Sequence, residues 1–234
     1  MSQVSRMPAL FAGHDIDCRS TDAALWQGWL QTAARFPQPR AIVCVSAQWQ
    51  TQGICISVAG RQHGELPYRE SSRVAQLIAG LLDLPSARLD SNHPLDEAVV
   101  SLVQALYPQS DIPLVQISLD TALSPLEHAA LGAWLRPLRE QGILIVGIGS
   151  IAQAATDVHA MRFRARVGEM AGHGNIAQLA ESTVMDHDQQ VAFLPLLYTL
   201  ALRAADDSVQ LFDDMQHGRN VTSVLLQPTP LARC

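Results

Sequence analysis

The chain has few charged residues, no long apolar run and no paired-cysteine motif, and each absence excludes a class of protein. Charged side chains make up 16% of the 234 residues and the formal net charge is −6, which leaves no basic face for nucleic acid or an anionic membrane. No apolar run approaches the roughly 20 residues that a membrane span needs. The first residues, MSQVSRMPALFAGHD, contain no convincing signal-peptide cleavage site, so we expect a cytoplasmic protein.

The four cysteines show none of the CxxC spacing that is typical of structural zinc or redox sites. Cys44 and Cys55 lie in apolar, strand-like runs. Buried thiols in such runs are typical of a reduced, cytosolic protein. We therefore predict that both are core residues.

What the sequence does contain is an alternation of strand and helix patterns. Apolar, β-branched runs predict strands at residues 7–12, 41–49, 53–59, 112–120, 143–150 and 220–228. Amphipathic segments between them predict helices, and Ser124, Pro125 and Glu127 form a capping box that opens one helix, which Gly142 closes. The strands read as buried on both faces, which is typical of a mostly parallel sheet. We predict one domain over residues 1–234, an α/β three-layer sandwich with a central, mostly parallel, mixed sheet.

Two details of this prediction are specific. In the helix that follows residue 70, one apolar stripe is predicted from Val74, Leu77, Ile78, Leu81 and Leu82. The last strand, residues 220–228, is predicted to lie at a sheet edge, and a buried helix is predicted over residues 193–205.

Ligands of open α/β sheets bind beyond the carboxyl ends of the strands, so the residues there are the candidates for chemistry. His14 follows the first strand and stands next to Asp15. A fixed neutral imidazole is a good metal ligand or general base. One histidine holds no catalytic metal, however, because such a site usually has three protein ligands. The other strand ends offer Gln48, Glu97 and Gln153.

Other polar motifs favour a structural interpretation. The GIGS turn lacks the third glycine of a dinucleotide fingerprint and the Lys-Ser/Thr of a P-loop. His128 lies on an amphipathic helix and is expected to be a satisfied structural histidine. The segments 186–188, 206–207 and 213–214 are predicted to be solvated.

The chain resembles the class III extradiol ring-cleavage dioxygenases, in the branch of the DOPA dioxygenases. The landmarks occur in family order and span almost the whole chain: MPALFAGHD, RAIVCVSAQW, HPLDEAVVSLVQALYP, DIPLVQISLD, the run from His128 to Arg139, GILIVGIGS, FLPLLY and VTSVLLQ. Active members of this family hold one divalent ion through histidines. The resemblance therefore implies a metal site at the strand ends.

Departures from the family pattern fall on the metal site itself. His14 matches the family's G-H-G-S-P histidine, although Asp15 follows it. Four of the five positions where the family has a site histidine carry another residue: Gln48, Glu97, Gln153 and Ala192. We therefore predict that most metal ligands have been lost and that no cofactor is bound, with Fe(II) or Zn(II) expected only if the site still functions.

Three functions remain open on this evidence. The first is a non-catalytic subunit or pseudoenzyme that forms a homo- or hetero-oligomer with a related subunit or binds a small aromatic ligand. The second is an enzyme with metal-free acid/base chemistry, in which His14, Asp15 and Glu97 are the catalytic residues. The third is an oxidoreductase of the extradiol type, a non-haem Fe(II) dioxygenase that uses His14 and Glu97 with a loop ligand such as His93 or His187.

Overall fold

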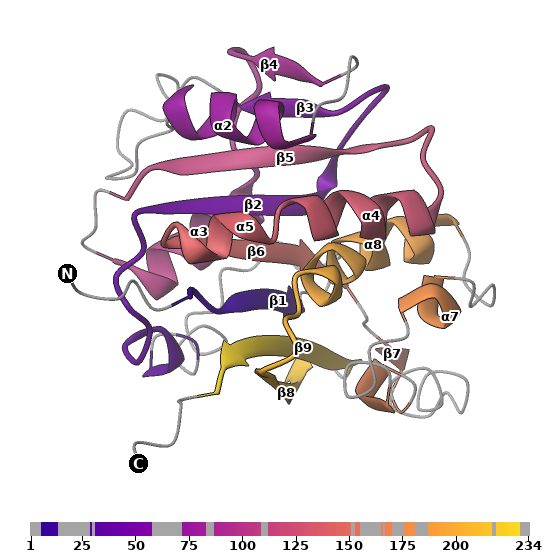
Figure 1. Cartoon of the computed structure of the whole chain (residues 1–234). Coiled ribbons are helices and arrows are strands. Elements are labelled where there is room, and N and C mark those ends of the chain that lie inside the picture. Colours follow the sequence, from indigo (N-terminus) through magenta and orange to yellow (C-terminus); the bar gives the residue numbers. More distant parts are fainter. Residues whose placement is uncertain are drawn as a thin grey trace.

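A nine-stranded mixed sheet organises the protein (Figure 1). The computed structural model describes residues 6–13, 29, 31–57, 72–82, 87–108, 112–150, 153–154, 165, 167–169, 176–180, 187–216 and 219–229. The strands are β1 (Ala9–Gly13), β2 (Ala41–Thr51), β3 (Cys55–Ser57), β4 (Arg88–Asp90), β5 (Leu114–Asp120), β6 (Ile143–Gly149), β7 (Gln153–Ala154), β8 (Asp207–Gln216) and β9 (Arg219–Pro228). Their order is β4-β3-β5-β2-β6-β1-β9-β7, with β8 paired to β9.

The four central strands β5, β2, β6 and β1 are parallel, as the sequence predicts. Every residue of β1, β5 and β6 is buried, which explains their continuous apolar runs. β3 pairs with β5 in the antiparallel direction and β9 does so with β1, so the sheet is mixed. Because parallel strands share one direction, the carboxyl ends of the central strands meet at one edge.

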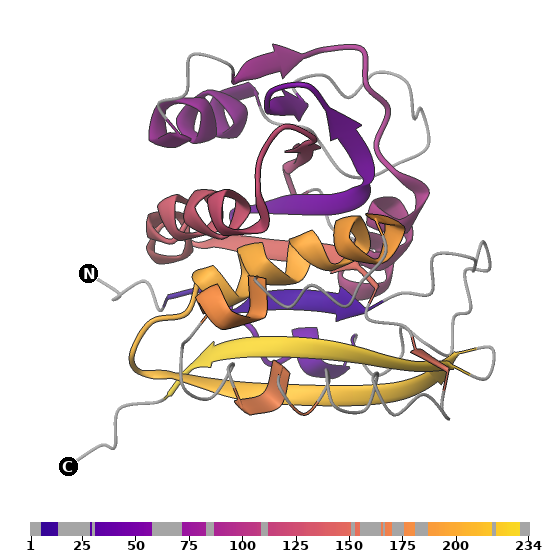
Figure 2. The same ribbon diagram turned by 90° about the vertical axis from the view of Figure 1, so that its right-hand side faces the viewer.

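Helices cover both faces of the sheet, which confirms the three-layer sandwich (Figure 2). The described helices are α2 (Ser72–Leu82), α3 (Glu97–Leu106), α4 (Pro125–Trp134), α5 (Pro137–Glu140), α7 (Ile176–Ala180) and α8 (His187–Ala201). The helix α3 packs with Leu10, Ile42 and Val146 on one face. On the other face, α2, α4, α7 and α8 share a core with the opposite side chains of the same strands. Among the helices that the structure describes, none is long and apolar enough to span a membrane.

The structure corrects the predicted helix over residues 124–142, which is two helices. The capping box at Ser124 and Glu127 is present, but α4 ends at Trp134 and the short α5 begins at Pro137. Pro137 has no N–H to continue the hydrogen-bond ladder, so the first helix stops before it. Gly142, at φ 80°, then makes the turn into β6.

Three further predictions differ from the structure. In α2 four residues of the predicted stripe face the core, since Ile78 and Leu82 are buried and Val74 and Leu81 pack against it, but the fifth, Leu77, is 36% exposed. The helix α8 begins at His187 rather than at residue 193. The strand β9 is not an edge strand, because β8 pairs along its whole length, from Asp207 to Gln216.

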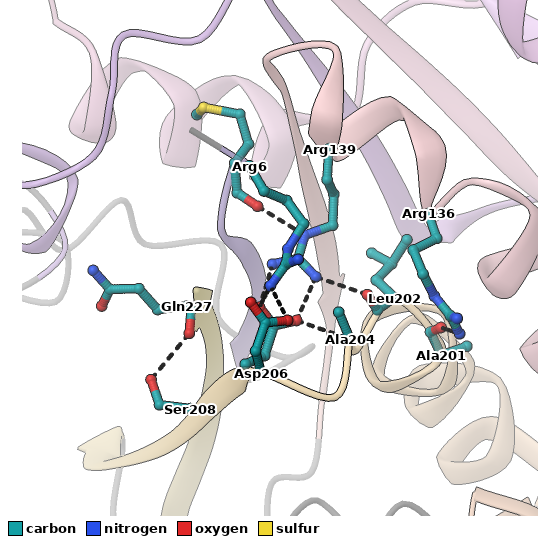
Figure 3. A network of polar contacts seen from close by, with 11 residues as sticks. Arg6, Arg136, Arg139, Ala201, Leu202, Ala204, Asp206, Ser208 and Gln227 are labelled. Carbon is teal, nitrogen blue, oxygen red and sulfur yellow. Dashed lines mark hydrogen bonds and ion pairs between the residues drawn. The ribbon is translucent and has the colours of Figure 1, made fainter. Parts of the chain in front are cut away.

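The ion pair between Arg139 and Asp207 joins four segments that are distant in sequence (Figure 3). Arg139 Nη1 donates to Asp207 Oδ2 at 2.6 Å and to the Leu202 carbonyl, and Arg139 Nε donates to the Met7 carbonyl. Arg6 adds a second guanidinium, which bonds both Asp206 and Asp207. The prediction that both aspartates are solvated is therefore wrong for Asp207, whose side chain is fully buried, while Asp206 stays 60% exposed.

Candidate functional site

The carboxyl ends of β1, β2 and β6 lie side by side, and the sequence predicts the site residues at this edge. Gly13 pairs with Gly149 at the ends of β1 and β6, and Ser46 of β2 pairs with Ile148. His14 and Asp15 follow Gly13 directly but lie outside the described residues. The side chains of Gln153, in β7, and of His187, the first residue of α8, are likewise not described. Three of the family's histidine positions can be placed, Gln48, Glu97 and Ala192, and so can the predicted loop ligand His93.

Gln48 lies on β2 where the strand becomes irregular. The pairing of β2 with β5 shifts register between Val45 and Gln50, and such a bulge re-aims the side chains that it contains. Ala47 and Trp49 are buried on either side, while Gln48 is exposed. The Gln48 N–H donates to Ser46 Oγ at 3.2 Å. An exposed, neutral amide therefore stands at the tip of the strand.

Ala192 lies in α8 directly against the end of β6. The Ser150 N–H donates to the Ala192 carbonyl oxygen at 2.9 Å, and Ala192 is 2% exposed. A Cβ added to Gly149 would collide with that same carbonyl. The GIGS glycines thus let the helix backbone approach the strand, which supports the structural interpretation of that turn.

Glu97 does not point into the protein, whereas Asp96 does. Glu97 is the first residue of α3 and is exposed. The Asp96 side chain is only 9% exposed, and its Oδ2 accepts a 2.6 Å hydrogen bond from Gln116 Nε2. In return, the Asp96 N–H donates to Gln116 Oε1 at 3.2 Å. Because its carboxylate is held by Gln116, Asp96 makes no side-chain cap bond to α3.

His93 completes a polar cluster on this side of the sheet. Its ring stacks on Trp49 with centroids 3.9 Å apart and planes 3° from parallel. Its Nε2 lies 3.6 Å from Asp96 Oδ1 and is buried without a hydrogen-bond partner. The His93 N–H donates to Asp90 Oδ1 at 3.2 Å, which fixes the loop. We call His93, Asp96, Gln116 and Trp49 the His93 cluster.

Sequence reasoning missed most of the His93 cluster, although one signal was available. Gln116 is a polar residue in the middle of the buried run IPLVQISLD, and it is 0% exposed. A buried amide needs hydrogen-bond partners, so its position indicated a polar neighbour across the sheet surface.

The negative charge of Asp96 also acts on Cys44: burial raises the pKa of that thiol, and Asp96 raises it further. Cys44 and Cys55 are both buried and free, as predicted.

His128 is structural, as predicted. Nε2 lies 3.1 Å from the Asp120 carbonyl, which can only accept, so this nitrogen carries the proton. Nδ1 then accepts from the Tyr198 hydroxyl at 3.2 Å. Burial lowers the pKa of His128, and the hydrogen bond to Asp120 opposes that shift only in part. The neutral imidazole is fully buried between α4 and α8.

An apolar cleft of about 430 Å³ lies elsewhere, between α2 and the α4–α5 junction. Its lining consists of Leu81, Leu82, Ala133, Trp134 and Pro137. The α4–α5 segment leads into the amino end of β6, so this cleft is remote from the strand carboxyl ends. It offers no group that could take part in chemistry.

The described residues do not fit the divalent ion that the resemblance implies. At two of the family's histidine positions they present a neutral amide, which is a weak ligand, and a methyl group, which is none. The carboxylate at a third, Glu97, is exposed. In the part of the chain that the structure describes, no three His, Cys, Asp or Glu side chains gather as a metal site.

Comparisons with known proteins agree with the resemblance. No family model matches the chain. The chain is 27% identical over 230 residues to 4,5-DOPA dioxygenase extradiol of Escherichia coli K12, covering 84% of this chain and 85% of that protein. It is 28% identical over 131 residues to the protein of the same name from Beta vulgaris, covering 48% of each. A solved structure of an uncharacterized E. coli K12 protein, JW3007, superposes with a TM-score of 0.80 at 25% identity, covering 95% of this chain and all of that one. The chain is therefore related to the class III extradiol dioxygenases, as its sequence motifs predict.

Proposed function

We propose that the chain is a dioxygenase-like protein that has lost most metal-ligand histidines and acts as a non-catalytic subunit or pseudoenzyme. The observation that carries the proposal is Gln48, an exposed amide on β2 where the family pattern has a metal histidine. Ala192 adds support, because it offers no donor and is packed against the end of β6. Two replaced ligands leave too few donors for a catalytic ion, which usually has three protein ligands.

Such a protein acts by binding. Its partner in the proposal is a related subunit, in a homo- or hetero-oligomer, or a small aromatic ligand. The relatives that match are named for an extradiol dioxygenase that acts on DOPA, so an aromatic ligand is the chemistry to test first. Neither nucleic acid nor a membrane is expected as a partner, given the net charge of −6.

Metal analysis together with oxygen uptake tests this proposal. The protein is purified anaerobically with added Fe²⁺, its iron is counted per chain, and oxygen consumption is followed with DOPA and catechol. The E. coli 4,5-DOPA dioxygenase extradiol, treated in the same way, is the positive control. We expect iron well below one per chain and no consumption above that of free Fe²⁺. One tightly bound iron with ring cleavage would instead support a non-haem dioxygenase using His14, Glu97 and a loop ligand.

A second function, metal-free acid/base chemistry, is favoured by the His93 cluster. A buried carboxylate behind an imidazole is the arrangement that fixes a general base in many enzymes. His14, Asp15 and Glu97 remain the residues predicted for this chemistry from the sequence, and Glu97 is exposed beside the cluster. Replacing His14 with Ala tests them, because a wild-type rate in that variant would remove His14 from any such mechanism.

A further inference from the structure

We propose that the exposed faces of α2 and α4 bind a second copy of this chain, related to the first by a two-fold axis through the apolar cleft between these helices. The proposal rests on the proposed function in one respect, that the chain acts as a subunit. It names the partner and the surface, and no part of it depends on the metal site.

The first observation is that large apolar side chains are exposed on these two helices. Trp134 is 47% exposed, Leu126 43% and Leu77 36%. Leu126, Ala130 and Trp134 follow one another at intervals of four residues along α4, so they share one face of that helix. A half-exposed tryptophan beside further apolar side chains is typical of a surface that binds another protein.

The second observation is the cleft of about 430 Å³ at the centre of this surface. The last two residues of α2 and the last two of α4 line it together with Pro137: Leu81, Leu82, Ala133 and Trp134. This lining contains no charged or amide side chain that could orient a polar small molecule. An apolar side chain of a protein partner suits such a cleft better.

The third observation is that both helices reach the cleft with their carboxyl ends and extend away from it on different sides. In Figure 1, α2 lies to the left of α4. At 1.5 Å per residue, Leu77 lies about 6 Å before Leu81 along α2, and Ala130 lies about 6 Å before Trp134 along α4. A two-fold axis through the cleft therefore places Leu77 opposite the partner's Ala130.

The fourth observation is that opposite charges lie at matching distances from the cleft. Arg73 is exposed on α2, about 12 Å before Leu81, and Glu127 is exposed on α4, about 10 Å before Trp134. The same axis therefore brings Arg73 of each copy toward the partner's Glu127, so that the surface is complementary to itself. Both hydrogen bonds from Ser124 go to Glu127 Oε2, which leaves Oε1, within the described part of the chain, available to a partner.

The balance of charge favours a second copy over a strongly acidic or basic partner. The helices α2, α4 and α5 with the residues between α4 and α5 carry two exposed cations and two exposed anions: Arg73, Arg136, Glu127 and Glu140. This surface is therefore neutral in sum, although the whole chain carries −6. Two copies can meet here without the like-charge repulsion that opposes contact elsewhere on an acidic protein.

Sedimentation equilibrium of the full-length protein in EDTA, over a concentration series, tests the proposal. Two short helices per copy form a small interface, so we expect a dimer in exchange with the monomer rather than an obligate one. The weight-average mass should rise with concentration from that of one chain, 25.4 kDa, toward twice that value.

Leu77→Glu is the first variant, because it places a charge in the apolar part of the interface. We expect it to raise the dissociation constant of the dimer by about tenfold or more and to keep the melting temperature of the wild type, since Leu77 faces solvent. Leu211→Glu is the matched control. Leu211 is 38% exposed and lies in β8, at the opposite edge of the sheet from β4, which α2 contacts, so this variant should dimerise as the wild type does.

Arg73→Glu tests the pairing of Arg73 with Glu127. This substitution places two anions at each of the two contacts and should raise the dissociation constant about tenfold. Adding Glu127→Lys makes the charges opposite again and should restore dimerisation, which a merely structural role of Arg73 would not produce. Because Glu127 also forms the capping box with Ser124, the melting temperature of each variant is measured in parallel.

A wild type that stays monomeric at the highest concentration would overturn the proposal and leave this surface to a different subunit or to an apolar small molecule. A dimer that persists unchanged in Leu77→Glu and in Arg73→Glu would also overturn it, because self-association would then use another surface. Neither readout involves iron, oxygen or DOPA, so a failure here is distinct from a failure of the non-catalytic assignment.

Discussion

The Arg139 guanidinium and the Asp207 carboxylate lie 2.6 Å apart with both side chains fully buried. Burial alone would raise the pKa of Asp207, but hydrogen bonds from Arg139, the Ala204 N–H and Arg6 outweigh it, so the pKa is lowered. The pair connects the start of β1, the end of α5, the end of α8 and the start of β8.

Replacing Asp207 with Ala should therefore destabilise the protein strongly. The change leaves Arg139 buried without its counter-charge, and breaking a buried pair in this way costs about 3–5 kcal/mol. Urea unfolding at neutral pH measures the loss. Asp206→Ala is the matched control, because the Arg6–Asp206 pair is solvent-exposed and such pairs contribute about 0–1 kcal/mol. Equal losses in the two variants would contradict a special role for the buried pair.

Stability should also fall with pH in two separate windows. The folded-state pKa of His128 is lowered, so the unfolded chain binds the proton first. Its contribution is fully present above the unfolded value of about 6.5 and is lost as pH falls below it. Asp207, whose pKa is lowered from 3.8, contributes above that value and loses its contribution only in stronger acid.

The His128 window can be isolated by substitution. We expect the free energy of unfolding of the wild type to decline from pH 7 to pH 5, with a slope of up to about 1.4 kcal/mol per pH unit for one proton. His128→Gln should be less stable at pH 7 but should have a flatter profile over this range. An unchanged slope in the variant would show that another group titrates there.

Substitution by alanine should have opposite effects at two glycines, Gly147 at the close approach of α8 to β6 and Gly80 on the exposed side of α2. A Cβ at Gly147 would lie 2.5 Å from the Pro195 carbonyl oxygen and 2.7 Å from Thr199 Oγ1, whereas a Cβ at Gly80 meets nothing within 4 Å. Gly147→Ala should cost about 1–3 kcal/mol by overpacking. Gly80→Ala, in the exposed interior of α2, should stabilise by about 0.5–1 kcal/mol. Thermal unfolding of both variants checks the contrast, and a tolerated alanine at 147 would show that α8 can shift outward.

Much of the fold could be predicted because the central strands are apolar throughout. A continuous apolar run such as ILIVGIGS predicts a strand that is buried on both faces. The capping box of Ser124 and Glu127 marks the start of a helix through hydrogen bonds between residues close in sequence. The strand β8, DSVQLFDDMQ, was missed since its three aspartates indicate solvent. Asp207 is buried because the guanidinium of Arg139, 68 residues earlier in the chain, binds its carboxylate in the folded protein. No local pattern contains that information.

The candidate site was predicted in part for a similar reason. Family motifs located Gln48, Glu97 and Ala192, but could not tell which carboxylate of the Asp96–Glu97 pair faces inward. The answer depends on Gln116, which approaches Asp96 from another strand. The stack of His93 on Trp49 also needs the loop after β4 to meet the end of β2. His14 and Asp15 remain predictions.

Restoring the family residue at one position should fail to restore the metal site. Gln48→His returns a strong donor to the end of β2, but Ala192 still offers none and Glu97 is exposed, so fewer than the usual three ligands converge. We expect iron to stay well below one per chain after loading with Fe²⁺, measured by elemental analysis. Gln50→His, an exposed position two residues further along β2, controls for adventitious binding by an added histidine. If Gln48→His bound one iron per chain and Gln50→His did not, His14 and a further group would already be placed to bind the metal. The replacement of the family's histidine by Gln48 would then be the change that disabled the site.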